Sequence, residues 1–585
     1  MTTPARDSSP DPILDPILDP RAGDFEDDAS STHQRSLLSL AGSLLSEISL
    51  PKLITLWLLL LLLPAVLLGL APLLITAWAI AVWTHTAGVG TELYPILLLP
   101  VLAAIGWFGG RRLLRVAEKS FWSLNALAVQ PIYIFFREGL RHLVEGLLPA
   151  LMRPSWRALV RSLCAAASGI VLCLLGVGLI MLLWPATLWV AHLADLRGLH
   201  LLLPSLLANS IVLITVYCAA AALVWGVGDA FMAQPLDLPG FAPPRPDDRT
   251  WRVAHLSDVH TVGERHGFRI ESGRAGPSGN RRLERTLARL DAIHRAQPLD
   301  LILITGDMTD AGRSGEWAEF FAALDAYPHL AERIVALPGN HDVNVVDRAS
   351  PARMDTPLSP MRRLRQMRTL SALERLQGRR MHVVTEAGLG GTLGTALRPL
   401  AEDIEAFADL GGPRRREREL GAAWDSAFPM VLPPAAPDGL GVIALDSNAD
   451  THFSFTNALG LIPTEQLRRV MAATTLYPKA GWIVALHHHV VEYPQKAKAL
   501  SMRIGTALIN GSLVIRRLQR LAGRAVIMHG HRHVDWIGQC GKLLIVSAPS
   551  PVMAPRDPYF YVHTLVMGTD GTVRLRAPQR VEVDG

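Results

Sequence analysis

An uncharged apolar stretch of about thirty residues, 53–83, is the feature that most constrains the fold of this chain. A helix needs about twenty apolar residues to cross a bilayer, and only helices and closed barrels satisfy their backbone polar groups there. The sequence therefore predicts a membrane-spanning helix at 53–83. Three further apolar segments, at 93–110, 163–184 and 201–227, are predicted to be spans as well, giving about four spans within residues 51–232.

Lys and Arg are distributed unevenly between the segments that join these spans. Residues 111–161 contain nine of them, residues 84–94 contain none, and residues 192–200 contain only Arg197. The positive-inside rule then places 111–161 in the cytoplasm. With four spans, both termini and the C-terminal half would lie on the cytoplasmic side of a bacterial-type inner membrane. The uncharged segment 121–136 is predicted to be an interfacial helix. If it crosses instead, the C-terminal half moves to the other side.

Composition predicts the character of three other regions. Residues 1–50 hold nine Asp or Glu against three Arg and show no sustained apolar periodicity, which predicts a disordered acidic tail. Residues 233–249 are rich in proline and are predicted to be a linker. Residues 250–585 carry most of the histidines and are predicted to form a soluble domain.

Charge and cysteine usage exclude two classes of function. The isoelectric point is about 9.1, but no basic run is interleaved with aromatic residues as a single-stranded nucleic-acid groove requires, so we expect no nucleic acid partner. Arginines beside the membrane segments account for the basic balance. The four cysteines lack C-x-x-C spacing, which argues against a disulfide framework or a thiolate metal site.

Six short apolar runs in the soluble domain have the length of buried strands, and each ends in polar side chains. They cover 253–256, 301–304, 334–337, 442–445, 482–486 and 525–528, and they lead into LSDVH, TGDMTD, PGNHD, ALDSN, ALHHH and MHGHRH. Helical patterns lie between them, which predicts an α/β sandwich. The polar residues would then converge at the carboxyl ends of the strands, in one crevice.

The polar residues at these strand ends offer carboxylate, amide and imidazole ligands without any thiolate. This mixture suits Mn, Fe, Zn or Co better than Ca or Mg. Seven ligands are too many for one such ion, so we predict two divalent cations that share a carboxylate and clamp a phosphoryl group. The candidate ligands are Asp258, His260, Asp307, Asn340, His487, His531 and His533.

In this order the motifs read D-x-H, G-D-x-x-D, G-N-H-D, H and G-H-x-H, and over residues 252–566 the chain resembles the calcineurin-like metallophosphoesterase superfamily. Within it, the class III cyclic nucleotide phosphodiesterase group is most similar. The resemblance implies a four-layer α/β/β/α sandwich. It also implies one metal held by Asp258, His260, Asp307 and His533, and a second held by Asp307, Asn340, His487 and His531. His341 would act on the phosphoryl oxygens or the leaving group, and Asp310 would orient His341.

Other polar residues lie near the motifs. Of the adjacent His487 and His488, the first is predicted to be the ligand because the family's motif places the ligand directly after the strand. His529 is predicted to be structural, and Asp446 with Ser447 to support the site through hydrogen bonds. Arg265, Arg269 and Arg274 could grip an anionic substrate or form a solvated basic loop.

A segment of about a hundred residues, 343–441, separates the third motif from the fourth. It is predicted to be an insertion that serves as a lid or substrate-selecting cap, or else as a solvated surface excursion.

These features predict a membrane-anchored, dinuclear metal-dependent phosphoesterase that hydrolyses a phosphodiester, a cyclic nucleotide or a similar molecule, by attack of a metal-bound hydroxide. Because the anchor confines the site near the bilayer, lipid phosphate head groups are an alternative substrate. A catalytically silent membrane scaffold or regulatory protein is the alternative of another class. The expected partners are the phosphoester substrate and the lipid bilayer, and the oligomeric state stays open.

Overall fold

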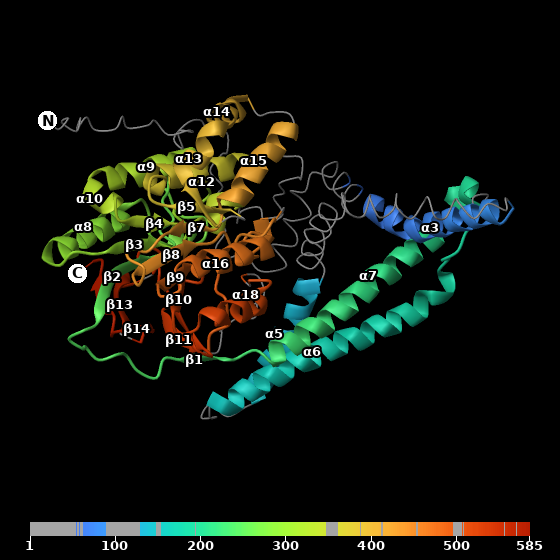
Figure 1. The fold of residues 1–585 in the computed structure, drawn as a ribbon, viewed down its shortest axis with the longest axis horizontal. Helices are drawn as coiled ribbons and strands as arrows, with labels where there is room; N and C mark the ends of the chain where they lie inside the picture. The colour runs from blue at the N-terminus through green and yellow to red at the C-terminus, as the bar shows by residue number, and fades with distance from the viewer. Residues whose placement is uncertain are drawn as a thin grey trace, which may run out of the picture.

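Three long apolar helices precede the C-terminal domain in the computed structural model (Figure 1). They are α3 (Leu63–Gly88), α6 (Pro154–Leu183) and α7 (Leu199–Ala230), each long and apolar enough to cross a membrane, and they match the first, third and fourth predicted spans. The second predicted span, 93–110, and the predicted tail, 1–50, lie outside the described residues. The structure describes residues 62–88, 129–147, 154–192, 195–346, 361–385, 388–410, 414–451, 454–494, 508–554, 556–568 and 570–584, with Ile54, Leu58 and Thr506 as single positions.

Helices α6 and α7 form an antiparallel hairpin whose far end contains η3 (Trp184–Ala186) and η4 (Asp195–Gly198). Glycine allows the two backbones to approach closely, because a Cβ added to Gly169 would lie 2.7 Å from the Ala222 carbonyl oxygen and 2.9 Å from Gly226 Cα. Close backbone packing of this kind is typical of helices that associate in membranes. Helix α3 packs on α7 near this far end, where Leu73 and Leu206 are buried together.

The shorter helix α5 (Gln130–Leu147) packs against the other end of the hairpin. Tyr133 and Ile134 of α5 are buried with Ala222 and Trp225 of α7. Residues 130–136 of the predicted interfacial segment form the start of α5, and residues 121–128 lie outside the described part of the chain. One face of α5 thus contacts other helices.

The C-terminal domain contains two sheets, and all six predicted strands are confirmed as β2, β3, β4, β8, β9 and β10. The nine-stranded sheet has the order β1-β11-β12-β10-β9-β8-β7-β5-β6; the other has the order β14-β13-β2-β3-β4, with β15 paired to β13. The strands are β1 (Pro235–Asp237), β2 (Arg249–Leu256), β3 (Leu301–Ile304), β4 (Ile334–Ala336), β5 (His382–Thr385), β6 (Gly388–Thr392), β7 (Met430–Leu432), β8 (Leu440–Ala444), β9 (Gly481–Ala485), β10 (Ala525–His529), β11 (Trp536–Cys540), β12 (Leu543–Ser547), β13 (Tyr559–Met567), β14 (Val573–Leu575) and β15 (Gln579–Glu582).

Helices cover the outer face of each sheet. One core cluster joins helices outside the smaller sheet, such as Leu287 of α8, to strand residues of both sheets, including Val253 and Ile483. A second core joins the outer face of the larger sheet to α16 and α18, for example through Val484 and Val470. These layers form the predicted α/β/β/α sandwich. Its helices are α8 (Arg281–Ala296), α9 (Ser314–Asp325), α10 (Pro328–Ala331), α11 (Asn340–Val343), α12 (Met361–Gln377), α13 (Leu393–Leu397), α14 (Ala401–Leu410), α15 (Arg414–Ala427), α16 (Thr464–Leu476) and α18 (Gly511–Leu518), with short 3-10 turns between some of them.

Two segments that were predicted to lie outside the sandwich contribute strands to it. Strand β1, within the predicted linker 233–249, pairs antiparallel with β11. Strands β5, β6 and β7, within the predicted insertion 343–441, extend the larger sheet. In the same insertion, Met367 and Leu370 of α12 are buried in the core. This part of the insertion is therefore neither a separate cap nor a solvated excursion, because its strands extend the larger sheet and its apolar residues are buried in the core.

Candidate metal centre

The six polar motifs meet between the two sheets. Strands β2, β3 and β4 are parallel to one another and carry the first three motifs, and β8, β9 and β10 are parallel and carry the last three. The carboxyl ends of parallel strands share one edge of their sheet. Two such edges, one from each sheet, therefore supply the side chains of a single site.

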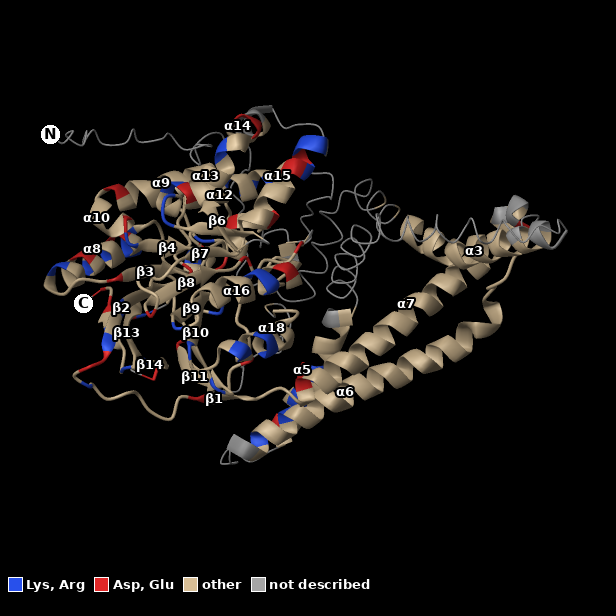
Figure 2. Ribbon diagram, viewed as in Figure 1, with Lys and Arg blue, Asp and Glu red and all other residues tan. Residues whose placement is uncertain are grey.

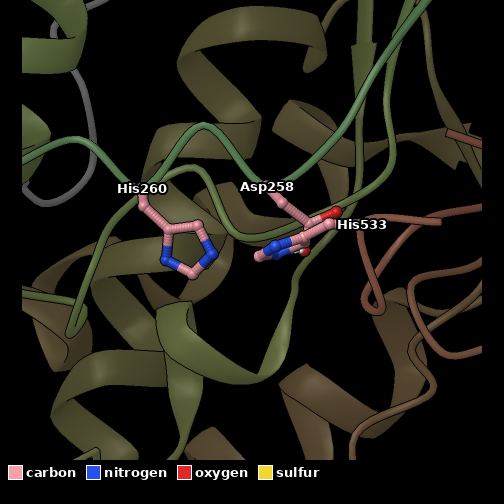
Figure 3. Close-up of side chains that lie close together, drawn as sticks. All are labelled: Asp258, His260 and His533. Atoms are coloured by element: carbon pink, nitrogen blue, oxygen red, sulfur yellow. Dashed lines mark ion pairs between the residues drawn. The ribbon is translucent and has the colours of Figure 1, made fainter. Parts of the chain in front are cut away.

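One ligand cluster consists of Asp258, His260 and His533, whose ligand atoms all lie within 4.8 Å of one another (Figure 3). His533 Nε2 is 3.3 Å from Asp258 Oδ1. Both of these atoms, and both ring nitrogens of His260, are buried and make no hydrogen bond within the described residues. Buried polar atoms without partners are costly, so their convergence fits a cation-binding site.

The second cluster consists of Asp307, His487 and His531, again with ligand atoms within 4.8 Å. His487 Nε2 lies 3.0 Å from Asn340 Oδ1 and 3.1 Å from His531 Nδ1. The other ring nitrogen of His487 is 2.7 Å from the Thr305 carbonyl oxygen. A carbonyl can only accept, so Nδ1 donates to it, and Nε2 is the ring nitrogen that faces the other candidate ligands, as a metal ligand requires.

Asp307 stands between the two clusters. Its Oδ2 lies 3.7 Å from His260 Nε2 and 3.3 Å from His487 Nε2. One carboxylate is thus within reach of both clusters, and the donor set of carboxylate, amide and imidazole fits two divalent cations of the Mn, Fe, Zn or Co type. The structure brings together all seven predicted ligands.

The backbone at these ligands is strained. Asp258, His260, Asp307, His531 and His533 all have positive φ, between 43° and 75°, and Asp557 is the one other non-glycine residue with positive φ in the described part of the chain. This region is unfavourable for residues with a Cβ and persists only where the surroundings impose it, commonly at functional sites. Gly339 allows a close approach, since a Cβ there would overlap the Asp307 carboxylate.

Opposite charges offset the burial of these ligands. Although burial opposes ionisation, His487 holds the pKa of Asp307 well below its usual range, and His533 lowers the pKa of Asp258. Burial lowers the pKa of His487 and His533, but the adjacent carboxylates outweigh it and raise each to about 9. The site therefore stabilises positive charge, whether on histidine or on a metal.

His341 lies over the first cluster, with its ring 4.4 Å from the ring of His260. Its Nδ1 is 2.7 Å from the carbonyl oxygen of Asp310. The carboxylate of Asp310 faces elsewhere, 2.7 Å from the Ile270 amide nitrogen and 3.3 Å from His260 Nδ1. Asp310 therefore contacts His341 through its main chain and contacts His260 through its side chain. Burial lowers the pKa of His341.

The neighbouring polar residues have separate places. His488 Nδ1 lies 2.9 Å from Ser447 Oγ, which also accepts hydrogen bonds from the amides of His487 and His488. Asp446 accepts a hydrogen bond from the Trp424 indole. His529 is buried at the end of β10, outside both ligand clusters, where burial lowers its pKa to about 3.

Three residues near the site have positions that the sequence did not predict. Arg269 is fully buried and donates to the carbonyl oxygens of Pro277 and Gly279, so it holds its loop together instead of meeting solvent. Glu271, two residues later, reaches the His260 and His341 ring nitrogens to within 4.8 Å. No motif marked Glu271. Arg532 was not predicted to take part in the site, although its position inside the G-H-x-H motif, between two predicted ligands, could have indicated it.

Comparisons with known proteins agree with this geometry in part of the domain. Residues 252–388 match the model of the calcineurin-like phosphoesterase family. A comparison with curated protein sequences finds no match.

Several solved structures are similar to this chain at low identity. A dimetal phosphatase from Danio rerio is 12% identical, with 57% of this chain and 98% of that chain covered and a TM-score of 0.32. The Haemophilus influenzae NAD nucleotidase is 11% identical, with 57% of each chain covered and a TM-score of 0.29. A purple acid phosphatase from yellow lupin (Lupinus luteus) is 11% identical, with 59% of this chain and 53% of that chain covered and a TM-score of 0.26. The chain spans only about half the length of the last two.

The family match covers the first three motifs, and the structure joins them to the last three in one buried site. Residues 252–388 are thus similar to the calcineurin-like phosphoesterase family, and this match together with the two ligand clusters supports a metal-dependent phosphoester hydrolase.

Proposed function

We propose that this protein is a membrane-anchored, dinuclear metallophosphoesterase that hydrolyses a phosphodiester such as a cyclic nucleotide. The observation that carries the proposal is the pair of ligand clusters joined by Asp307, whose Oδ2 lies within 3.7 Å of a histidine nitrogen in each. Two divalent cations, when bound there, would supply positive charge to the phosphoryl oxygens and activate a water molecule.

The residues around the clusters each have a task in this reaction. Asp258, His260, Asp307 and His533 would hold one cation, and Asp307, Asn340, His487 and His531 the other. The Asp310 carboxylate orients His260, and the Thr305 carbonyl oxygen orients His487. Most of these ligands are buried, which strengthens the interactions between these groups and a phosphoryl anion.

His341 is the candidate acid for the leaving group. Its Nδ1 faces a carbonyl oxygen and keeps its proton, so Nε2 is the atom available to a substrate. The negative charge of a bound phosphoester favours a second proton on this ring. His341 can then donate from Nε2 to the departing oxygen.

We propose that the domain lies on the cytoplasmic side of an inner membrane. Helix α6 begins and helix α7 ends beside the domain, while the α6–α7 connection lies at the far end (Figure 1). Arg157 and Arg161 are at the domain end of α6, which the positive-inside rule assigns to the cytoplasm. A reporter fused after Asp247 and active only outside the cytoplasm would contradict this orientation.

The central test is a Mn²⁺-dependent assay of the full chain with bis(p-nitrophenyl) phosphate, alongside Asp307→Asn. We expect hydrolysis by the unaltered chain and none above background by the variant. Absence of hydrolysis with every divalent metal, in a chain shown to bind metal, would favour a catalytically silent scaffold. Cyclic nucleotides, phospholipids and isoprenoid phosphates then identify the substrate class.

Lipid phosphate head groups are a second candidate substrate. The specific observation that favours them is contact between the membrane helices and the domain, where Arg161 of α6 donates to the carbonyl oxygens of Tyr493 and Pro494. This contact keeps the metal centre close to the bilayer. Hydrolysis of a phospholipid in vesicles without hydrolysis of cyclic nucleotides would establish this candidate over the first.

A further inference from the structure

Buried ion pairs tie the domain ends of α5, α6 and α7 together, and we call these residues the junction cluster. Figure 2 shows these helices almost free of charged residues along the rest of the hairpin, with charges gathered where α5 meets α6. The side chains involved are at most 18% exposed. The pairs are Arg137 Nη1 with Asp229 Oδ2 at 2.6 Å, Arg141 Nη1 with Glu138 Oε1 at 3.1 Å, and Arg161 Nε with Glu145 Oε1 at 2.8 Å.

Arg161 extends this cluster into the C-terminal domain. While its Nε contacts Glu145, its Nη1 and Nη2 donate to the carbonyl oxygens of Tyr493, at 3.2 Å, and Pro494, at 2.8 Å. All three guanidinium nitrogens are therefore engaged, two of them with the loop that follows β9. A planar group fixed at three points holds that loop in one position relative to α6.

Glu492, in the same loop, connects it to the metal ligands. Its Oε1 is 3.2 Å from His489 Nε2, and its Oε2 accepts a hydrogen bond from Arg532 Nη1 at 3.0 Å. The guanidinium of Arg532 also lies over the ring of Tyr493, 5.2 Å from its centre. Arg532 stands in sequence between two predicted ligands, His531 and His533. Glu492 thus holds the one residue that separates them.

The segment held by Glu492 needs such support. His531 and His533 both have positive φ, 75° and 52°, a conformation that their own backbone disfavours. Glu492 also faces the junction cluster directly, since it lines one cavity together with Arg137 and Arg141. Although burial opposes ionisation, His489, Arg532 and Arg141 hold the pKa of Glu492 below its usual range. A carboxylate is therefore maintained between the membrane helices and the ligand loop.

We propose that Glu492 is a positioning residue that links the docked position of the membrane helices, through Arg532, to the placement of the metal ligands His531 and His533. The proposal rests on the proposed function, because it takes these histidines to be metal ligands. The membrane helices are then part of the machinery that sets metal affinity, and more than an anchor.

The test uses the full chain in detergent, freed of metal, with Mn²⁺ binding measured by calorimetry and confirmed by elemental analysis. Glu492→Gln removes the charge that holds Arg532, and Arg161→Met releases the loop from α6. Arg285→Gln is the matched control, because Arg285 forms an exposed ion pair with Asp584 on the same domain. We expect Glu492→Gln to weaken Mn²⁺ binding about tenfold or more, as is typical for groups that support metal ligands. We expect Arg161→Met to act in the same direction with a smaller effect, and the control to bind as the unaltered chain does.

Two further readouts separate positioning from general stability. Glu492→Asp keeps the charge and should recover part of the lost affinity. In Glu492→Gln, the hydrolysis of bis(p-nitrophenyl) phosphate should be reduced more at low Mn²⁺ than at saturating Mn²⁺, where kcat should be closer to that of the unaltered chain. In the double variant, the two losses should combine to less than their product, since they act along one path. Unaltered Mn²⁺ affinity in both single variants would overturn the proposal. So would a fall in the unfolding temperature of Glu492→Gln without any change in the affinity of the folded fraction. Mn²⁺ binding without hydrolysis would sink the proposed function alone, whereas a chain that binds no metal would sink both.

Discussion

The metal centre and the junction cluster both bury several charged side chains, but they satisfy them differently. In the junction cluster each arginine faces a carboxylate, as Arg137 does with Asp229 and Arg161 with Glu145. In the metal centre the buried Nε2 atoms of His531 and His533 make no hydrogen bond within the described residues. Removing a partner from the first cluster leaves a charge unpaired, whereas the donor atoms of the second are arranged to take a cation as their partner.

This difference distinguishes a cluster that holds helices together from a cluster that could bind a metal ion. Charges that neutralise one another can hold helices together without a ligand, at a cost in desolvation that is offset by their mutual attraction. Donor atoms that converge on a strained backbone are typical of a site that binds a ligand. Glu492 lies where these two kinds of cluster meet.

The largest effect should follow from Asp307→Asn, which removes the carboxylate that faces both metal clusters. We expect metal content to fall from about two ions per chain to below about one, and hydrolysis to be lost. Elemental analysis of purified protein measures this. Asp446→Asn is the matched control, a buried carboxylate that accepts hydrogen bonds from Trp424 and Asn448 and should retain both metals. Equal metal loss in the two variants would contradict the bridging role.

His341→Ala should separate chemistry from metal binding. The His341 ring contacts the Asp310 carbonyl oxygen through Nδ1, and the backbone amide of His341 donates to the Asp307 carboxylate. Because the amide is unchanged in the variant, we expect the ligands to keep their positions without the ring. We expect kcat to fall by about a hundredfold to ten-thousandfold with unchanged metal content. Loss of metal together with activity would assign His341 to the metal shell.

The α6–α7 hairpin should respond to a single methyl group. In Gly169→Ala the new Cβ meets the Ala222 carbonyl oxygen and the Gly226 backbone, which should destabilise the protein by about 1–3 kcal/mol. Gly178→Ala, on the same helix, meets nothing within 4 Å and should be neutral or stabilising. Thermal unfolding in detergent compares the two. Equal midpoints for the two variants would show that the helices do not pack as described.

The smallest effect concerns pH. Burial raises the pKa of Asp446 to about 6, above the value of about 3.9 for an unfolded chain. The folded state therefore favours the protonated form, and this contribution to stability is present below about pH 4 and is lost as the pH rises through about 6. We therefore expect the unfolding midpoint of the unaltered chain to fall, relative to that of Asp446→Asn, as the pH rises from 5 to 8. A constant difference would contradict the raised pKa.

The predictions from sequence succeeded where a short pattern determines the result. Runs such as 301–304 and 482–486 have strand length and apolar composition, and both are buried strands. The helices α6 and α7 follow from length and hydropathy alone. The patterns did not reveal that β2–β4 and β8–β10 lie in different sheets, because strand pairing depends on contacts between distant segments. The strands β5–β7 of the 343–441 segment escaped prediction for the same reason.

The sequence by itself determined the candidate ligands and the apolar helices, because ligand types, their order after apolar strands, and the length and hydropathy of a helix are local properties. Only the tertiary structure decided how those parts cooperate. It brought Asp307 within reach of two histidine clusters, presented Glu271 to the site, and placed Arg161 of helix α6 against the loop that carries Glu492. The physical reason is that a single hydrogen bond or ion pair between residues hundreds of positions apart leaves no periodicity or spacing in the chain.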